Sequence, residues 1–489
     1  MSWPRQPRPA RLGAAMVAGW LVLVPRSGSA QRAAAPDDDP PAPASAVRSS
    51  GPAVEDPNRH ARALLERIDA PLGLRLAEAI ARAVARAPAV ARQKATAEAA
   101  EADVDAAFVG LMPRTRATLS YTHLSDVDNP PLGPAPIPVI RNNFSAMGQI
   151  EYSLSALFLS GLDGYAATKR QRDAEDLQVR VEEAAVAFDT QLAYLDAVAA
   201  DVDARALGLT LARFRAFERQ VAAQRRAGTA TQADTLAASS RTQLARAALE
   251  GNRIERRRAR RALRLLVGKT PRGPRRRAVL VLPGAPKGSV DASVRLALGR
   301  RVEPAVVDQR IAAAENLREA TSGRRWPDLS ASATMRNANP NPRILPPVEE
   351  FRFDWSVGVA LSFSLSNHFA VKAETARASA QVSALKEQRE DLRRAIRRQV
   401  IDAHAAWRSL HAQRQPMHAA YVAAAEAHRL REVAYAAGTA SSQAVFDALD
   451  EFRTAEQRFV GVLIGEMRAK ALLRFAEGRL GWARPRQPR

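Results

Sequence analysis

The sequence predicts an α+β fold in which long antiparallel helices are joined to short paired strands. Ala166 to Arg226 contains no proline and one glycine, Gly208, so this stretch predicts one continuous helix. Val371 to Ala437 is a second helical run of similar length. Between the helical runs the apolar period changes from 3.6 to 2 residues, which is typical of strands. These three observations define the predicted fold class.

The first long helix is also predicted to pair with other helices. At 1.5 Å per residue it would be roughly 90 Å long, too long to pack inside an ordinary globule. Its apolar residues return at heptad-like intervals, which indicates coiled-coil packing along one stripe. The stripe includes Leu207, Leu211, Phe214 and Val221.

The chain contains two copies of one unit. Both long helices end at nearly the same turn, Ala227-Gly228-Thr229-Ala230 and Ala437-Gly438-Thr439-Ala440. An internal repeat at such a spacing decides the architecture. Three more pairs of anchors follow in the same order: Pro88-Ala89-Val90 with Pro304-Ala305-Val306, Pro113 with Pro327, and Leu159-Ser160 with Leu365-Ser366.

The N-terminus predicts export. Three arginines precede the apolar run Gly13 to Val24, and Gly28-Ser29-Ala30 offers small residues for cleavage. The predicted division is 1–30 as signal peptide, 31–72 as disordered leader, 73–267 as first repeat, 268–290 as linker, 291–478 as second repeat and 479–489 as basic tail.

Each repeat is predicted to run helix, β-hairpin, long helix, glycine turn and returning helix. In the first repeat, Leu74 to Val109 is helical with a break at Pro88, and the returning helix is Gln232 to Val267. The second repeat has helices at Asp291 to Arg300, Pro304 to Thr321 and Gln443 to Glu477, with a kink expected at Pro416.

The predicted strands alternate apolar and polar residues, as in Phe351, Phe353 and Trp355 against Arg352 and Asp354. Each is about ten residues long, enough for a tilted crossing of a bilayer. Four strands between long helices have no second sheet to cover their apolar face, whereas lipid could cover it. Because about eight strands are needed to close a barrel, several chains must contribute to one.

Composition excludes several other classes. The chain has no cysteine and therefore no disulfide or acylated cysteine. It has no phosphate loop, nucleophile elbow or zinc-binding HExxH motif, so no enzymatic activity, cofactor or resident metal is expected. His404, His411 and His418 recur every seven residues, a spacing of about 10 Å that is too long for one metal ion. The net charge of +22 would favour binding to nucleic acid, but a protein exported from the cytoplasm is separated from nucleic acid.

Together these features resemble the TolC-like outer membrane efflux family, also called channel-tunnels, over about Leu74 to Gly478. The resemblance implies a homotrimer with a twelve-stranded transmembrane β-barrel in the lipid of the cell outer membrane and a helical tunnel in the periplasm. It implies a passive exit duct for small molecules, loaded by a periplasmic adaptor protein and an inner-membrane transporter. The alternatives are the outer membrane component of type I protein secretion and a periplasmic coiled-coil protein without a pore.

The resemblance also implies functional residues at the two helix turns. Gly228-Thr229 and Gly438-Thr439 correspond to the turns that adaptor hairpins contact. Tyr435 corresponds to a tyrosine that holds the tip closed, and Asp234 to its acidic partner. Of the family's constricting acidic pair, one position is Ala444 and the other is Asp447, so a trimer would carry a single acidic ring. Ala440 replaces an arginine of the family's salt-bridge lock. Asp447→Ala is expected to weaken block by multivalent cations.

Overall fold

The computed structural model describes residues 69–125, 140–269, 278, 280–286 and 288–479. The predicted signal peptide, most of the leader, part of the linker and the tail after Arg479 lie outside these ranges. The predicted fold class is confirmed, because the described residues form long helices and one four-stranded antiparallel sheet.

The first repeat begins with a short 3₁₀ turn, Pro71–Gly73, followed by α2 (Leu76–Arg86) and α3 (Pro88–Val109). The two helices are separated at Ala87, whose φ of −60° and ψ of 123° are extended. Proline disfavours the helical conformation at the residue before it and lacks the N–H of a helix interior. The break predicted at Pro88 is therefore confirmed.

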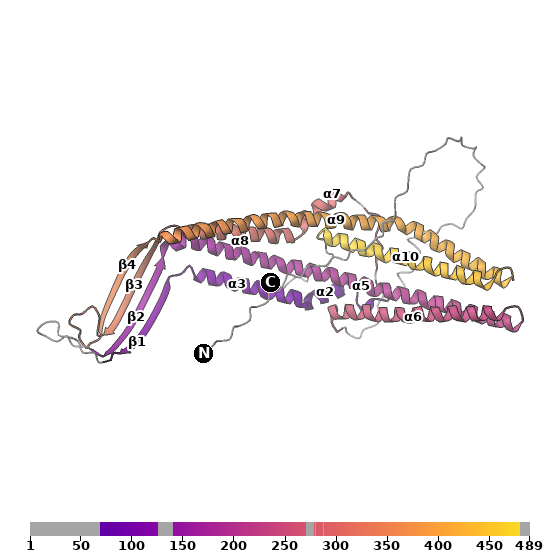
Figure 1. The fold of residues 1–489 in the computed structure, drawn as a ribbon, viewed down its shortest axis with the longest axis horizontal. Coiled ribbons are helices and arrows are strands. Elements are labelled where there is room, and N and C mark those ends of the chain that lie inside the picture. The colour runs from indigo at the N-terminus through magenta and orange to yellow at the C-terminus, as the bar shows by residue number, and fades with distance from the viewer. Residues whose placement is uncertain (1–68, 126–139, 270–277, 279, 287, 480–489) are drawn as a thin grey trace, which may run out of the picture. The chain divides into compact units, whose positions relative to one another are not determined.

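Two very long helices organise the rest of the fold (Figure 1). The first, α5 (Leu162–Arg226), has 65 residues, and the second, α9 (Leu365–Ala436), has 72 residues. Pro416 lies inside α9, which remains one unbroken helix at the position where a kink is expected from the sequence. The returning helices are α6 (Gln232–Val267) and α10 (Ser442–Ala476), within one residue of the predicted bounds.

The entry into α5 corrects one of the sequence anchors. After the strands, the first repeat continues with the three-residue helix α4 (Leu154–Ala156) and a π-helical turn at Leu157–Gly161. Ser153 caps the start of α4, and Ser364 caps the start of α9 in the same way. The structural counterpart of Ser364-Leu365-Ser366 is therefore Ser153-Leu154-Ser155, and the match to Leu159-Ser160 is wrong. Leu159 lies inside the π turn, which α9 lacks.

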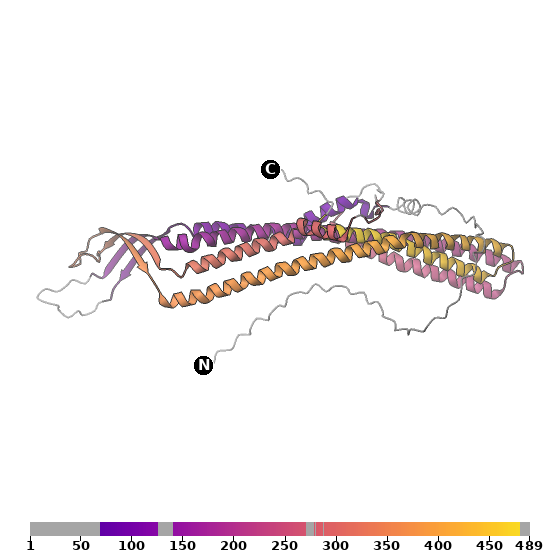
Figure 2. The same ribbon diagram turned by 90° about the horizontal axis from the view of Figure 1, so that it is seen from above.

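Shorter helices lie end to end along each long one (Figures 1 and 2). Helices α3 and α6 pack along α5, while α8 (Glu303–Gly323) and α10 pack along α9. Both α8 and α10 also contact α5, and α7 (Val290–Arg300) packs on α9. None of the helices in the described part of the chain combines the length and hydropathy of a membrane-spanning segment.

The sheet consists of β1 (Arg114–His123), β2 (Asn142–Ser153), β3 (Asp328–Asn339) and β4 (Arg352–Ser362), paired in that order. Both predicted hairpins are present, and β2 pairs with β3 to join the two repeats. The register places Gly148 opposite Met335, and Met335 opposite Trp355. Paired residues of an antiparallel sheet share a face, so this row is apolar on all strands.

The apolar face of the sheet is exposed to an unusual degree. Trp355 is 66% exposed, and Val357, Val359 and Leu361 are each 70% exposed. The opposite face carries the polar row Arg116, Gln149, Thr334 and Ser356. The two-faced pattern predicted from the sequence is therefore present.

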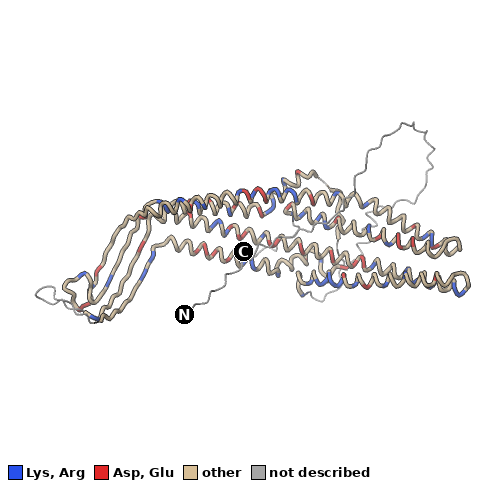
Figure 3. Tube along the Cα trace, viewed as in Figure 1, with Lys and Arg blue, Asp and Glu red and all other residues tan. Residues whose placement is uncertain are grey.

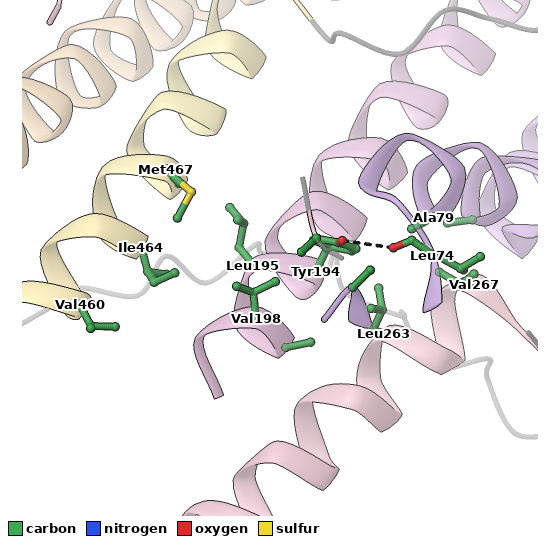
Figure 4. Packing of buried hydrophobic residues seen from close by; sticks show 14 residues of the cluster. Leu74, Ala79, Tyr194, Leu195, Val198, Leu263, Val267, Val460, Ile464 and Met467 are labelled. Atoms are coloured by element: carbon green, nitrogen blue, oxygen red, sulfur yellow. Dashed lines mark hydrogen bonds between the residues drawn. The ribbon is translucent and has the colours of Figure 1, made fainter. Parts of the chain in front are cut away.

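Buried residues gather in separate clusters along the helices. Near the middle, Tyr194 of α5 donates a 3.2 Å hydrogen bond to the carbonyl oxygen of Leu74, among residues from α6 and α10 (Figure 4). Near the glycine turns, the heptad residues of α5 pack against Leu449 and Phe452 of α10. The predicted stripe Leu207, Leu211, Phe214 and Val221 is buried throughout.

Candidate gate at the helix turns

Both glycine turns have the same backbone geometry. Gly228 has a φ of 79° and Gly438 a φ of 77°, a left-handed conformation that glycine adopts without strain. The N–H of Thr229 donates to the carbonyl oxygen of Gln224, and the N–H of Thr439 donates to that of Ala434, each at 2.9 Å. This is the Schellman ending of a helix. The two predicted turns therefore present their threonines in equivalent ways.

The returning helices begin differently in the two repeats. Thr231 caps α6, and the Asp234 carboxylate accepts a 3.0 Å hydrogen bond from the Thr231 N–H, which completes a capping box. Ser441 caps α10 through its hydroxyl, with Ala444 at the position equivalent to Asp234. Only the first turn therefore carries a carboxylate beside its cap.

Tyr435 connects the two hairpins, but not through the expected partner. Its hydroxyl donates to Gln224 Oε1 of α5, and its ring lies 4.9 Å from that of Phe217, measured between centroids. Burial raises the pKa of the Tyr435 phenol, and the negative charge of Asp234 raises it further. The structure thus brings Tyr435 near Asp234, and Gln224 supplies the hydrogen bond.

Asp234 instead bonds to the start of α10. Its Oδ1 accepts a 2.5 Å hydrogen bond from the hydroxyl of Ser442. The hydroxyls of Ser442 and Thr231, followed by the Thr231 N–H, hold the pKa of Asp234 below its usual value. Asp234 therefore remains ionised and joins α6 to α10.

Asp447 lies on the exposed side of α10, with its side chain 62% exposed. It accepts a 2.7 Å hydrogen bond from Gln443, one turn earlier. Arg241 of α6 approaches it to 3.8 Å and bonds to Asp450 at 2.6 Å. Asp447 is thus accompanied by a second carboxylate and by an arginine from the other hairpin.

The sequence-based interpretation missed Gln224, Ser442 and Arg241. The sequence does contain a signal for these residues. In two adjacent helical hairpins, residues that are equally far from their turns lie at the same level along the helix axes. Gln224 and Tyr435 precede their turn glycines by four and three residues, while Arg241 and Asp450 follow theirs by thirteen and twelve. Comparing the two repeats by distance from the glycine would have found these pairs.

A second group of polar residues joins the hairpins farther from the turns. The guanidinium of Arg213 on α5 lies 4.6 Å from the ring centroid of Phe452 on α10. The ring of His428 on α9 stacks on the same phenylalanine at 6.0 Å, and its Nε2 is 3.6 Å from Glu432. Burial lowers the pKa of His428, opposed by the charge of Glu432 and assisted by that of Arg213.

The three regularly spaced histidines do not form a metal site. In the described part of the chain, no group of three or more His, Cys, Asp or Glu residues is arranged to hold a metal ion. His404 and His418 are buried, and His411 Nδ1 lies 2.7 Å from Glu466 Oε1. Arg414 donates to the same carboxylate at 3.1 Å and to the carbonyl oxygen of Pro283. This buried charge cluster fastens the inter-repeat segment to α9 and α10.

Comparisons with known proteins agree with this fold. The model of the outer membrane efflux protein family matches residues 294–478. A membrane protein from Pseudomonas aeruginosa is similar with 21% identity and a TM-score of 0.72, over 83% of this chain and 90% of that one. The outer membrane channel CmeC from Campylobacter jejuni is 15% identical with a TM-score of 0.73, over 84% of this chain and 86% of that one. The outer membrane protein VceC from Vibrio cholerae is 16% identical with a TM-score of 0.72, over 84% of this chain and 96% of that one. A comparison with curated proteins gives no match.

The fold and the paired turns define a protein of the TolC-like channel-tunnel class. The model of the outer membrane efflux protein family matches its second repeat, residues 294–478. The resemblance deduced from the sequence is therefore confirmed, and so is the expectation of a channel instead of an enzyme, because proteins of this family are not enzymes.

Proposed function

We propose that this protein is the outer membrane exit duct of a tripartite efflux system and carries small molecules outward from an inner-membrane transporter. The observation that supports this most directly is the isolated sheet, with its exposed apolar face and its polar opposite face. Acyl chains would cover the apolar face, and water would fill the space beside the polar face.

The duct would be a homotrimer. Within the described residues, β1 and β4 each pair with a single strand, so both sheet edges offer unpaired backbone groups. A membrane-spanning sheet must close to satisfy such groups. Four strands are too few to enclose a lumen, whereas three chains supply twelve, enough for a barrel with an interior.

The helices would extend the same passage into the periplasm. The tip would be the gate, held by Tyr435 with Gln224, Asp234 with Ser442, and Arg241 with Asp450. All three contacts join one hairpin to the other, so separating the hairpins breaks them together. A periplasmic adaptor would dock at Gly228-Thr229 and Gly438-Thr439.

The pore is tested by purifying the protein in detergent and adding it to a planar lipid film. We expect a trimer in native mass spectrometry and stepwise conductance. A monomer that leaves membranes in alkaline carbonate without detergent would refute the proposal. Because the chain has no cysteine, Thr229→Cys and Thr439→Cys provide unique crosslinking sites for the adaptor, with Thr168→Cys on α5 as a control far from the turns.

The cargo is tested in cells that lack the gene. Increased drug susceptibility with an unchanged secreted-protein profile would support small-molecule efflux. Unchanged susceptibility with the loss of a secreted protein would assign the duct to protein secretion instead.

A further inference from the structure

The ionic contacts at the tip place one arginine against two carboxylates. Arg241 Nη1 is 2.6 Å from Asp450 Oδ2, and Arg241 Nη2 is 3.8 Å from Asp447 Oδ1. Arg453 adds a second cation at 3.6 Å from Asp450. The two carboxylates are 62% and 32% exposed, so they face solvent with the guanidinium group beside them.

The net formal charges of the residues around the two glycine turns are equal and opposite. Residues 218–241, around the first turn, contain four arginines and two carboxylates, while residues 428–451, around the second, contain two arginines and four carboxylates. All of these residues are described by the structure, and charges of both signs are spread along the helices (Figure 3). The first hairpin is therefore the cationic partner of the second.

We infer that Arg241 suppresses the cation site that Asp447 and Asp450 would otherwise form, so that anionic and neutral solutes pass the tip as readily as cations. This inference rests on the proposed function, because it requires the tip to be the narrow mouth of a channel. A ring of unpaired carboxylates in a narrow pore concentrates cations and repels anions. A guanidinium within contact distance cancels most of that field at the carboxylates themselves.

The inference changes the meaning of Asp447. The family resemblance implies a single acidic ring at Asp447 and block by multivalent cations. In the structure the chain has two carboxylates at this level, Asp447 and Asp450, together with Arg241 from the opposite hairpin. Arg241 is therefore a residue that determines charge selectivity, and organic anions are the class of solute that it allows to pass in addition to cations and neutral solutes.

The test uses the full-length protein in planar lipid films. Reversal potentials in a potassium chloride gradient give the charge selectivity, and hexaamminecobalt(III) added to the tip side probes a cation site. We expect the unmodified channel to discriminate weakly between K⁺ and Cl⁻ and to resist block. Arg241→Gln should become cation-selective and should be blocked at a roughly tenfold lower concentration.

Three further variants separate charge from structure. Arg241→Lys keeps the positive charge and should behave like the unmodified channel. Arg246→Gln removes an exposed charge from the same helix, away from the two carboxylates, and should also leave block unchanged. Adding Asp447→Asn and Asp450→Asn to Arg241→Gln should abolish the acquired block.

Strong cation selectivity or block in the unmodified channel would overturn the inference, even if Arg241→Gln failed to assemble. Equal block in the unmodified channel and Arg241→Gln would do so as well. Failure of the unmodified protein to conduct at all would instead count against the proposed function.

Discussion

Tyr435 of α9 donates its hydroxyl hydrogen to the side chain of Gln224 on α5, and this bond joins the two helical hairpins beside their turns. Tyr435 is 8% exposed and packs on Phe217, so its position is fixed by the core as well as by the hydrogen bond. A contact of this kind keeps the hairpins together without making their separation prohibitively costly.

Tyr435→Phe should therefore favour separation of the hairpins. Losing one hydrogen bond between uncharged groups costs about 1 kcal/mol, so the open fraction should rise several-fold. Single-channel recording measures this fraction. Gln224→Leu should have a similar effect, and the double variant should add little, because the two residues share one bond. Tyr165→Phe, near the sheet end of α5, serves as the control. Fully additive effects would show that the bond does not contribute to closure.

Acidification should destabilise the protein through protonation of His428. Burial lowers the pKa of this imidazole, so the unfolded chain takes up a proton at a higher pH than the folded chain does. The stabilisation is then complete above the ordinary histidine pKa of about 6.5 and is lost as the pH falls below it. Thermal unfolding followed by circular dichroism should show Tm falling over this range.

His428→Gln should reduce that slope because residue 428 no longer titrates. Identical pH profiles for the unmodified protein and His428→Gln would exclude His428 as the source.

The contact between α8 and the π turn should tolerate no side chain at Gly323. A Cβ atom at this residue would lie 1.5 Å from the carbonyl oxygen of Leu159, so the backbone would have to move. We expect Gly323→Ala to lower the free energy of unfolding by about 3 kcal/mol. Gly208→Ala is the matched control, since a Cβ atom at Gly208, in the interior of α5, would meet nothing within 4 Å. It should stabilise the protein by about 0.5 to 1 kcal/mol. Equal effects of the two substitutions would contradict the close approach.

The buried carboxylate of Glu466 should be required only while its cationic partner Arg414 remains. Glu466→Leu leaves Arg414 buried without its counter-charge and should destabilise the protein by about 3 to 5 kcal/mol. Adding Arg414→Met should recover much of the loss, because an apolar pair of similar size can replace a buried ion pair. Chemical denaturation measures both values. A double variant as unstable as Glu466→Leu would contradict the unpaired charge of Arg414 as the cause of the destabilisation.

The helices, the strands and the two-faced sheet were predictable from the sequence because they depend on local periodicity. The bounds of α6, Gln232–Val267, were predicted to the residue, because Thr231 is its N-cap and Gly268 its C-cap. The glycine turns were predictable for the same reason.

The partners across the hairpins were not predicted, because they depend on how two separate coiled coils align. Asp234 was identified as a partner of Tyr435, yet each bonds to a different residue of the opposite hairpin. The pairing of Leu159 with Leu365 was wrong because matching letters do not reveal which serine caps a helix. Distances from Ser153 and Ser364 would have given the correct alignment.

The pairing of β2 with β3 determines when the sheet can be completed. Phe144 lies opposite Asn339, so the hydrogen bonds between these two strands cannot form until nearly two hundred further residues have been synthesised. During that time, the backbone N–H and C=O groups along one edge of β2 lack their partners in β3, and the apolar face of the first hairpin is exposed. The first hairpin therefore remains an incomplete sheet until the second half of the chain has been synthesised.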